Sequence, residues 1–122
     1  MFEPLHGRCY CGKLRFEVTS EPLETVVCHC PDCRRAIGAQ SVAWISVPKT
    51  SFDITDGQLK SFSLRAGIER FFCGDCGTSI AWESSEYPDR VDITIGSLDE
   101  PARVPPEKAV HRRFRIPWAS RI

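Results

Sequence analysis

Seven cysteines in three short clusters constrain the fold of this chain more than any other feature of the sequence. The clusters have the spacings Cys-x-Cys (Cys9, Cys11), Cys-x-Cys-x-x-Cys (Cys28, Cys30, Cys33) and Cys-x-x-Cys (Cys73, Cys76). An odd number of cysteines argues against a disulfide framework, because one thiol would be left without a partner. Zinc instead needs thiolates that short loops hold close together. The spacing therefore predicts metal binding rather than scattered buried cysteines.

Length and charge narrow the class of protein. The 122 residues are enough for one domain with a modest core, which we expect to span 1–122. Sixteen basic residues balance sixteen acidic ones, so the net charge disfavours nucleic acid and anionic membrane as partners. The N-terminus lacks a signal-peptide pattern, and no apolar run approaches the ~20 residues of a transmembrane helix. We expect a cytoplasmic protein without a membrane partner, and the sequence leaves its oligomeric state open.

Short runs of alternating apolar and polar residues, or of β-branched and aromatic residues, predict a mainly β fold. We expect strands over 14–18, 42–47, 52–54, 59–64, 68–72, 78–82 and 91–95. Gly, Pro, Asp and Ser bound these runs, which is typical of strands joined by turns. Helical turns are expected only at 33–39 and around 99–103, where prolines keep the second segment extended or turned.

The seven cysteines divide into a site of four and a site of three, because only this division leaves every cluster intact. Both cysteine pairs end in Cys-Gly, at Gly12 and Gly77, and a glycine there lets backbone N–H groups turn toward the sulfurs. We therefore predict a closed tetrahedral site that clips the N-terminal strand to the middle of the chain. This four-cysteine cluster consists of Cys9, Cys11, Cys73 and Cys76.

The remaining cysteine trio, Cys28, Cys30 and Cys33, has the composition of an open site. Cys28 and Cys30 would project to one face at the end of a strand, and a turn at Pro31-Asp32 would bring Cys33 back toward them. Three protein ligands with an open fourth position are the pattern of catalytic zinc.

A closed alternative also fits the sequence. In it His6, His29, His111 or an acidic residue completes the trio's shell. His29 is disfavoured, because it lies between two ligands on the expected strand and should point to the opposite face. His111 could reach the trio from the C-terminal segment.

Five segments together resemble the glutathione-dependent formaldehyde-activating enzyme family, whose domain also occurs in centromere protein V. They are GRCYCG (7–12), CHCPDCRRAIG (28–38), FFCGDCGTSI (71–80), ITIGSLDEP (93–101) and the stretch from His111 to Trp118. The resemblance covers about 7–118 and implies a β-tent fold, in which curved antiparallel sheets meet at a zinc site. It also implies two zinc ions per chain, a structural one on the four-cysteine cluster and a reactive one on the trio.

The activity that the resemblance implies is that of a zinc-dependent carbon–sulfur lyase. Such an enzyme forms or cleaves S-(hydroxymethyl)glutathione from glutathione and formaldehyde, or acts on a related thiol adduct. The trio's missing ligand would then be the substrate's sulfur, with water in the resting state. A non-enzymatic, zinc-stabilised β-tent module for protein or nucleic-acid binding is the alternative. Thiol–disulfide chemistry at a Cys-x-x-Cys pair needs metal-free thiols and a thioredoxin-like βαβ context, which the expected strands do not supply.

Several polar residues near the trio are candidates for a supporting role. Arg34 and Arg35 follow it directly and are expected either to contact an anionic group of the substrate or to lie in a solvated turn. Asp32 is either a proton relay or a turn residue. The aromatic residues Trp44, Phe72 and Trp82 are expected in the core rather than in a pocket wall, and the HRRFR segment (111–115) on a solvated basic face.

Overall fold

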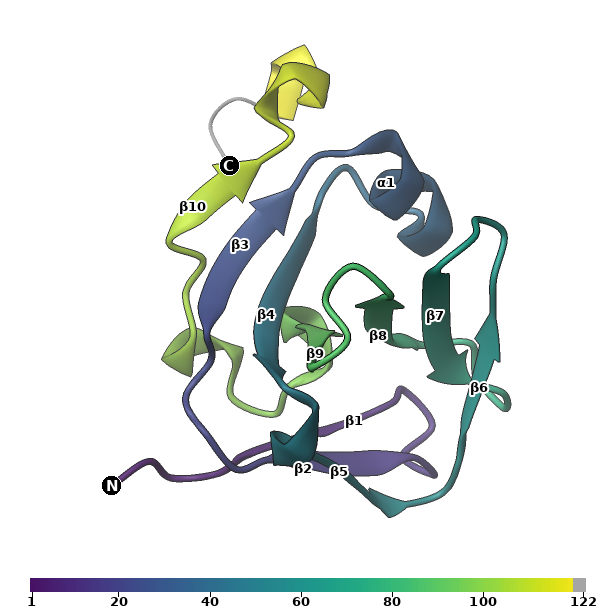
Figure 1. Ribbon diagram of the computed structural model, residues 1–122, viewed down its shortest axis with the longest axis vertical. Coiled ribbons are helices and arrows are strands. Elements are labelled where there is room, and N and C mark those ends of the chain that lie inside the picture. Colours follow the sequence, from purple (N-terminus) through teal and green to yellow (C-terminus); the bar gives the residue numbers. More distant parts are fainter. Residues whose placement is uncertain (120–122) are drawn as a thin grey trace.

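Two β-sheets form the body of the computed structural model, which describes residues 1–119 (Figure 1). The smaller sheet is antiparallel, in the order β1-β2-β5, and the larger has the order β10-β3-β4-β9-β8-β7-β6. Only the β10–β3 pair of the larger sheet is parallel within the described residues. The strands are β1 (Leu5–Arg8), β2 (Arg15–Val18), β3 (Glu24–Cys28), β4 (Val42–Pro48), β5 (Phe52–Asp56), β6 (Leu59–Phe62), β7 (Ile68–Cys73), β8 (Ser79–Ser84), β9 (Arg90–Thr94) and β10 (Lys108–Val110). The last three residues of the domain expected over 1–122 lie outside the described part.

The prediction of a mainly β fold is confirmed. Each of the expected runs is a strand whose ends differ by at most two residues from the expected ones. Three further strands, β1, β3 and β10, lie outside these seven runs, and β3 ends at Cys28, where the cysteine spacing had implied the end of a strand. Strand β1 escapes the alternation rule because Gly7 is one of its two core-facing residues. A Cβ atom at Gly7 would lie 2.2 Å from the ring of Phe16, so the aromatic ring fills the place of a side chain.

Helical structure is short. Helix α1 (Pro31–Ile37) begins two residues before the expected 33–39 segment, and Pro31 occupies its first turn, where the fixed φ of proline favours a helix. The turn expected at Pro31-Asp32 is thus the first turn of α1, and it brings Cys33 back to Cys28 and Cys30. The 3₁₀ turns are η1 (Lys49–Ser51), η2 (Ile95–Ser97), η3 (Pro101–Arg103), η4 (Arg112–Phe114) and η5 (Pro117–Ala119). Within the described residues no helix is long and apolar enough to cross a membrane.

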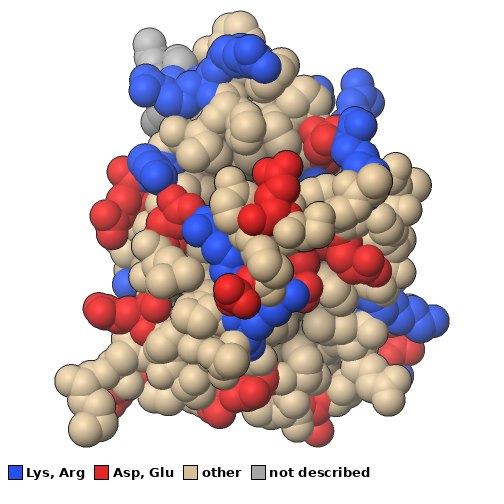
Figure 2. All heavy atoms as spheres, viewed as in Figure 1, with Lys and Arg blue, Asp and Glu red and all other residues tan. Residues whose placement is uncertain are grey.

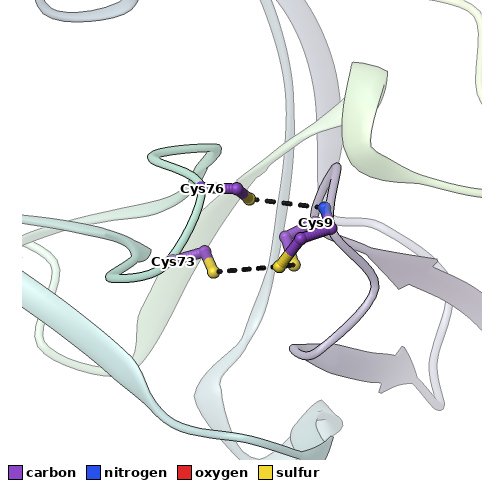
Figure 3. Close-up of side chains that lie close together, drawn as sticks. Cys9, Cys73 and Cys76 are labelled. Atoms are coloured by element: carbon purple, nitrogen blue, oxygen red, sulfur yellow. Dashed lines mark hydrogen bonds between the residues drawn. The ribbon is translucent and has the colours of Figure 1, made fainter.

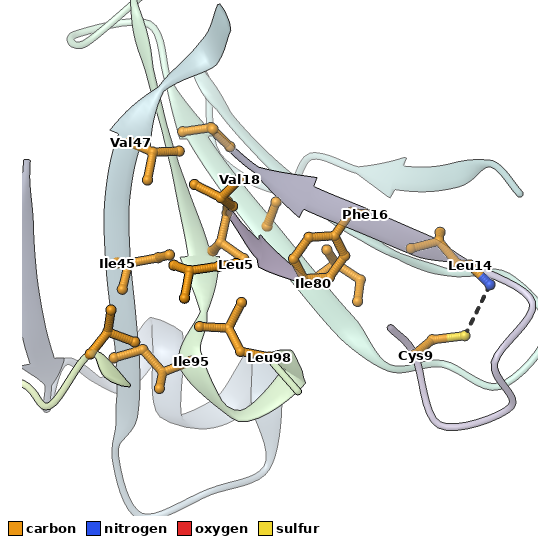
Figure 4. Packing of buried hydrophobic residues seen from close by; sticks show 14 of the residues in the cluster. Leu5, Cys9, Leu14, Phe16, Val18, Ile45, Val47, Ile80, Ile95 and Leu98 are labelled. Atoms are coloured by element: carbon orange, nitrogen blue, oxygen red, sulfur yellow. Dashed lines mark hydrogen bonds between the residues drawn. The ribbon is translucent and has the colours of Figure 1, made fainter. Parts of the chain in front are cut away.

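The main core lies between the two sheets (Figure 4). Its almost fully buried members include Leu5, Phe16, Val18, Ile45, Val47, Ile80 and Ile93, which come from both sheets. Each such side chain contributes about 1.5–3 kcal/mol relative to an exposed one. The core thus holds the sheets face to face and fixes the strands whose ends carry the cysteines.

A second apolar cluster lies on the opposite face of the larger sheet. Along β4, Trp44 alternates with Ile45 of the main core, so Trp44 projects from the other face. The cluster consists of the buried residues Val26, Cys28, Cys33, Val42 and Trp44, with Cys30, Ile37, Trp82 and Val110 packed against them. The cysteine trio is therefore part of this second cluster and lies away from the main core.

An ion pair fixes α1 over that face. The Arg65 guanidinium in the β6–β7 turn donates to both carboxylate oxygens of Asp32, through Nε at 2.7 Å and Nη2 at 2.8 Å. Two-point pairing of this kind restrains orientation as well as distance. Figure 1 shows the result, with α1 lying between the ends of β3 and β4 and the β6–β7 turn.

Candidate metal centres

The four-cysteine cluster forms where the two sheets meet. Cys9 and Cys11 lie in the β1–β2 turn of the smaller sheet, while Cys73 ends β7 and Cys76 lies in the β7–β8 turn of the larger one. Figure 3 shows the sulfurs of the two turns facing one another. All four Sγ atoms lie within 4.8 Å of one another, as the sequence predicted.

The distances within this cluster fit zinc. A tetrahedron with Zn–S bonds of about 2.3 Å places its sulfurs about 3.8 Å apart. The Sγ atoms of Cys9 and Cys11 are 3.5 Å apart, and those of Cys11 and Cys73 are 3.9 Å apart. These separations are far beyond a disulfide bond, and all seven cysteines are free thiols.

Backbone donors already stabilise negative charge on these sulfurs. The Leu14 N–H donates to Cys9 Sγ at 3.4 Å, and the Cys11 N–H donates to Cys76 Sγ at 3.5 Å. Gly12 and Gly77, which follow the last ligand of each pair, adopt φ angles of +80° and +83° that glycine reaches without strain. Hydrogen bonds from the Thr78 hydroxyl, the Thr78 N–H and the Cys11 N–H lower the pKa of Cys76 to about 5.

The cysteine trio gathers at the junction of β3 and α1. Cys28 is the last residue of β3, Cys30 is the N-cap of α1, and Cys33 lies in the first turn of the helix. The expectation that Cys28 and Cys30 share a strand face is therefore wrong, because the strand ends between them. Cys30 Sγ accepts the Cys33 N–H at 3.3 Å, as an N-cap side chain does. The three Sγ atoms lie within 4.8 Å of one another.

Arg70 is the charged group nearest to the trio's sulfurs. Arg70 lies in the middle of β7, and its Nη2 atom donates to Cys33 Sγ over a distance of 3.8 Å. Hydrogen bonds from the Cys28 and Cys30 thiols and from Arg70 lower the pKa of Cys33 to about 5, although burial opposes the shift. The bond to Cys33, together with burial, raises the pKa of Cys28. One thiol of the trio is thus held as the thiolate that a metal cation requires.

No histidine, acid or further cysteine among residues 1–119 joins the trio. The His29 ring is 2% exposed and lies outside the cluster, where burial and the charge of Arg115 lower its pKa. His6 faces Glu17 on the smaller sheet at 4.0 Å, and His111 is the N-cap of η4. The closed alternative therefore has no fourth protein ligand in the described part of the chain.

Three residues at the trio keep part of their surface exposed, namely Cys30, Ile37 and Trp82. Cys28 and Cys33, by contrast, are buried. Trp44 is 4% exposed and is a core residue, as the sequence predicted, but half-buried Trp82 borders the trio. Both Trp82 and Arg70 belong to one row of cross-strand neighbours, Ser46, Asp92, Trp82 and Arg70.

The other candidates divide between structure and surface. Asp32 is held by Arg65, and the hydrogen bond between them lowers the pKa of Asp32, so its carboxylate is a clamp rather than a free proton relay. Arg34 and Arg35 lie on α1, and neither side chain forms a hydrogen bond or ion pair with any residue from 1 to 119. Phe72 pairs with Phe62 at a ring-centroid distance of 5.9 Å.

Two surface hollows lie elsewhere on the molecule. Their volumes are about 660 and 350 Å³, and Phe2, Glu21 and Arg103 line both. Neither lining includes a cysteine. The donor chemistry of the thiols, not the size of a cavity, therefore identifies the candidate sites.

Arg70 is the site residue that sequence analysis missed. A signal existed, because Phe71 was expected in a strand and packs against the main core. Arg70 must then project from the opposite face of that strand. The sequence alone could not show that this face of the strand lies next to α1 and the cysteine trio.

This fold and these clusters define a small β protein built around two groups of thiols, each of which could hold a metal ion. The family model described as glutathione-dependent formaldehyde-activating enzyme matches residues 4–113. The chain therefore belongs to that family.

Two individual proteins are also similar to this chain. A Halomonas elongata protein that carries the name glutathione-dependent formaldehyde-activating enzyme is 27% identical over an alignment of 112 residues, and the match covers 85% of this chain and 71% of that protein. A crystal structure of a Rhodobacter sphaeroides protein superposes on this one with a TM-score of 0.70. The superposition includes 86% of this chain and 99% of the Rhodobacter chain. Its sequence identity of 20% makes this a likeness of fold alone.

Proposed function

We propose that the protein is a zinc-dependent carbon–sulfur lyase that forms or cleaves the adduct of a small thiol and an aldehyde. Glutathione and formaldehyde are the first pair to test, since the family and the Halomonas relative carry both names. The observation that carries the proposal is a trio of thiols with no fourth protein ligand among residues 1–119. We infer a cytoplasmic location from the seven free thiols, which a reducing compartment preserves.

In this proposal the two clusters have different roles. Cys9, Cys11, Cys73 and Cys76 hold a structural zinc ion, and Cys28, Cys30 and Cys33 hold a reactive one. Zinc at the trio would supply a site where a substrate thiol loses its proton and becomes a nucleophilic thiolate. The chain's own residues position the reactants: Trp82 and Ile37 form the apolar border that limits water, and Arg70 offsets part of the trio's negative charge. Arg34 and Arg35 are proposed contacts for a carboxylate of a peptide-like thiol.

A binding module is the second candidate function, and the C-terminal surface favours it. Figure 2 shows basic side chains at the top of the view, where Figure 1 places the C-terminal turns, while both charge signs mix over the rest of this face. Phe114 and Trp118 in those turns are 40% and 70% exposed. A module of this kind would use both metal centres only to stabilise the fold.

The purified protein should carry two zinc ions per chain. The donor sets are all sulfur and their spacing fits tetrahedral zinc, so both clusters should retain metal through purification. Elemental analysis together with native mass spectrometry gives the number. A reproducible value of one would contradict either the division into four and three or the occupancy of the trio.

Glutathione should bind the zinc-loaded protein saturably, and formaldehyde should then be converted faster than in buffer. Isothermal titration measures binding, and exchange NMR measures the rate of adduct formation against the uncatalysed reaction. S-methylglutathione is the matched control, because it keeps every charge of glutathione but has no free thiol. Equal binding of the two peptides, or no binding of either, would count against a thiol at the trio.

A further inference from the structure

Arg70 has a hydrogen-bonding group that the protein leaves unused. Its Nη2 atom donates to Cys33 Sγ at 3.8 Å, while its Nη1 atom is buried and has no partner among residues 1–119. A buried guanidinium N–H without an acceptor costs free energy, so native proteins seldom keep one without a reason. Because both nitrogens belong to one planar guanidinium, the unused donor lies beside the trio.

Two acids that could pair with Arg70 are bound to other groups. Asp92 is two strands away in the same row and accepts the Ser46 hydroxyl at 2.6 Å. The charge of Arg70 helps to lower the pKa of Asp32, but both carboxylate oxygens of Asp32 accept hydrogen bonds from Arg65. Arg70 therefore has no carboxylate partner in the described structure, and its guanidinium contacts the thiol of Cys33 instead.

We propose that Arg70 is a catalytic residue whose Nη1 binds the aldehyde oxygen of the substrate, a role that rests on the proposed lyase function. The substrates are then adducts in which the carbon bonded to sulfur also carries oxygen. Simple thioethers and alkyl thiols lack that oxygen and should bind the site more weakly.

The reaction balances without an oxidant or reductant. As the thiolate sulfur adds to the carbonyl carbon, a carbon–sulfur bond forms and the π electron pair of the carbonyl moves to oxygen. That oxygen takes up one proton, equal to the one that the thiol released, and becomes a hydroxyl. Arg70 keeps its own protons and donates a hydrogen bond that strengthens as charge grows on the oxygen. Cleavage reverses each step.

Arginine suits this task better than lysine. Its planar group presents several N–H donors in fixed directions, so one nitrogen can serve Cys33 Sγ while the other serves the substrate oxygen. A lysine ammonium at the same place has one nitrogen for both acceptors.

Two probes of nearly equal size test the proposal by binding alone. Thioacetate carries oxygen on the carbon bonded to sulfur, and ethanethiol has two hydrogens there instead. Titration calorimetry of the zinc-loaded protein gives a dissociation constant for each probe, and zinc is counted in every sample beforehand. The variants are Arg70→Met, Arg70→Lys and the control Lys60→Met, which removes an exposed cation from the neighbouring strand β6.

The wild type should prefer thioacetate. In Arg70→Met that preference should fall about 10- to 100-fold, the loss expected for a charge-assisted hydrogen bond, while ethanethiol binding stays within about threefold. Lys60→Met should behave as the wild type. If Arg70→Met loses zinc or fails to fold, Arg70→Lys decides instead, with a fall of at least about threefold expected.

Four results would overturn the proposal. An unchanged preference in Arg70→Met and Arg70→Lys would show that the oxygen binds elsewhere. Equal weakening of both probes would show that Arg70 only balances the trio's charge. If the wild type binds neither probe, both the proposed lyase function and the proposed role of Arg70 are wrong. If the wild type binds thioacetate and ethanethiol equally well, only the proposed role of Arg70 is wrong.

Discussion

The Cys73→Ser variant should fail to fold at ordinary temperatures. Cys73 is 2% exposed at the end of β7, and its sulfur approaches Cys11, a residue 62 positions earlier in the chain. A structural zinc site contributes about 10–16 kcal/mol in small zinc-binding peptides, which is as large as the whole stability of a typical domain, about 5–15 kcal/mol. Losing one of four thiolates should therefore remove most of the free energy that holds the two sheets together.

Circular dichroism and a thermal melt, with zinc counted in the same sample, measure this effect. Stripping the wild type with a strong zinc chelator should produce the same unfolded spectrum, which separates loss of metal from the substitution itself. A Cys73→Ser protein that melts like the wild type and retains two zinc ions would show that the four-cysteine cluster has no structural role.

The fold was predictable wherever the signal was local. Alternation along a strand identified seven strands, because the side chains that face the core recur every second residue. It failed for β1, where the ring of Phe16 takes the place of a side chain at Gly7, and that contact depends on the register between two strands. It also failed for β10, a strand of three residues that is defined mainly by its parallel pairing with β3.

In the site, too, the parts that depend on neighbouring residues could be predicted, and a contact between distant strands and helices could not. The cysteine trio comes from one short segment, and the four-cysteine cluster joins two close pairs that lie 62 residues apart. Local spacing identified the pairs and the trio, and keeping each of them intact was enough to join the two pairs. Arg70 meets Cys33 from a position 37 residues away, across the gap between β7 and α1. A contact of that kind depends on how α1 is anchored to the β6–β7 turn by Asp32 and Arg65, and no local pattern reports it.

The Cys33→Ser variant should fold yet lose all thiol chemistry. Cys33 belongs to a cluster built from one short segment, so the four-cysteine clip between the sheets remains intact. The cost should be about 1–3 kcal/mol, because a buried thiol in the second apolar cluster becomes a hydroxyl and the first turn of α1 loses its metal. Zinc should fall from two ions per chain to one, and binding of glutathione should disappear.

Melting Cys33→Ser and Cys73→Ser side by side distinguishes the enzyme from the binding module. The lyase proposal requires a large difference in stability between the two variants and a complete loss of glutathione binding in Cys33→Ser. A module with two structural zinc ions requires similar destabilisation by both substitutions and no glutathione binding by the wild type. Comparable melting temperatures would therefore mean that the trio is a second structural site, whose fourth ligand is not a substrate.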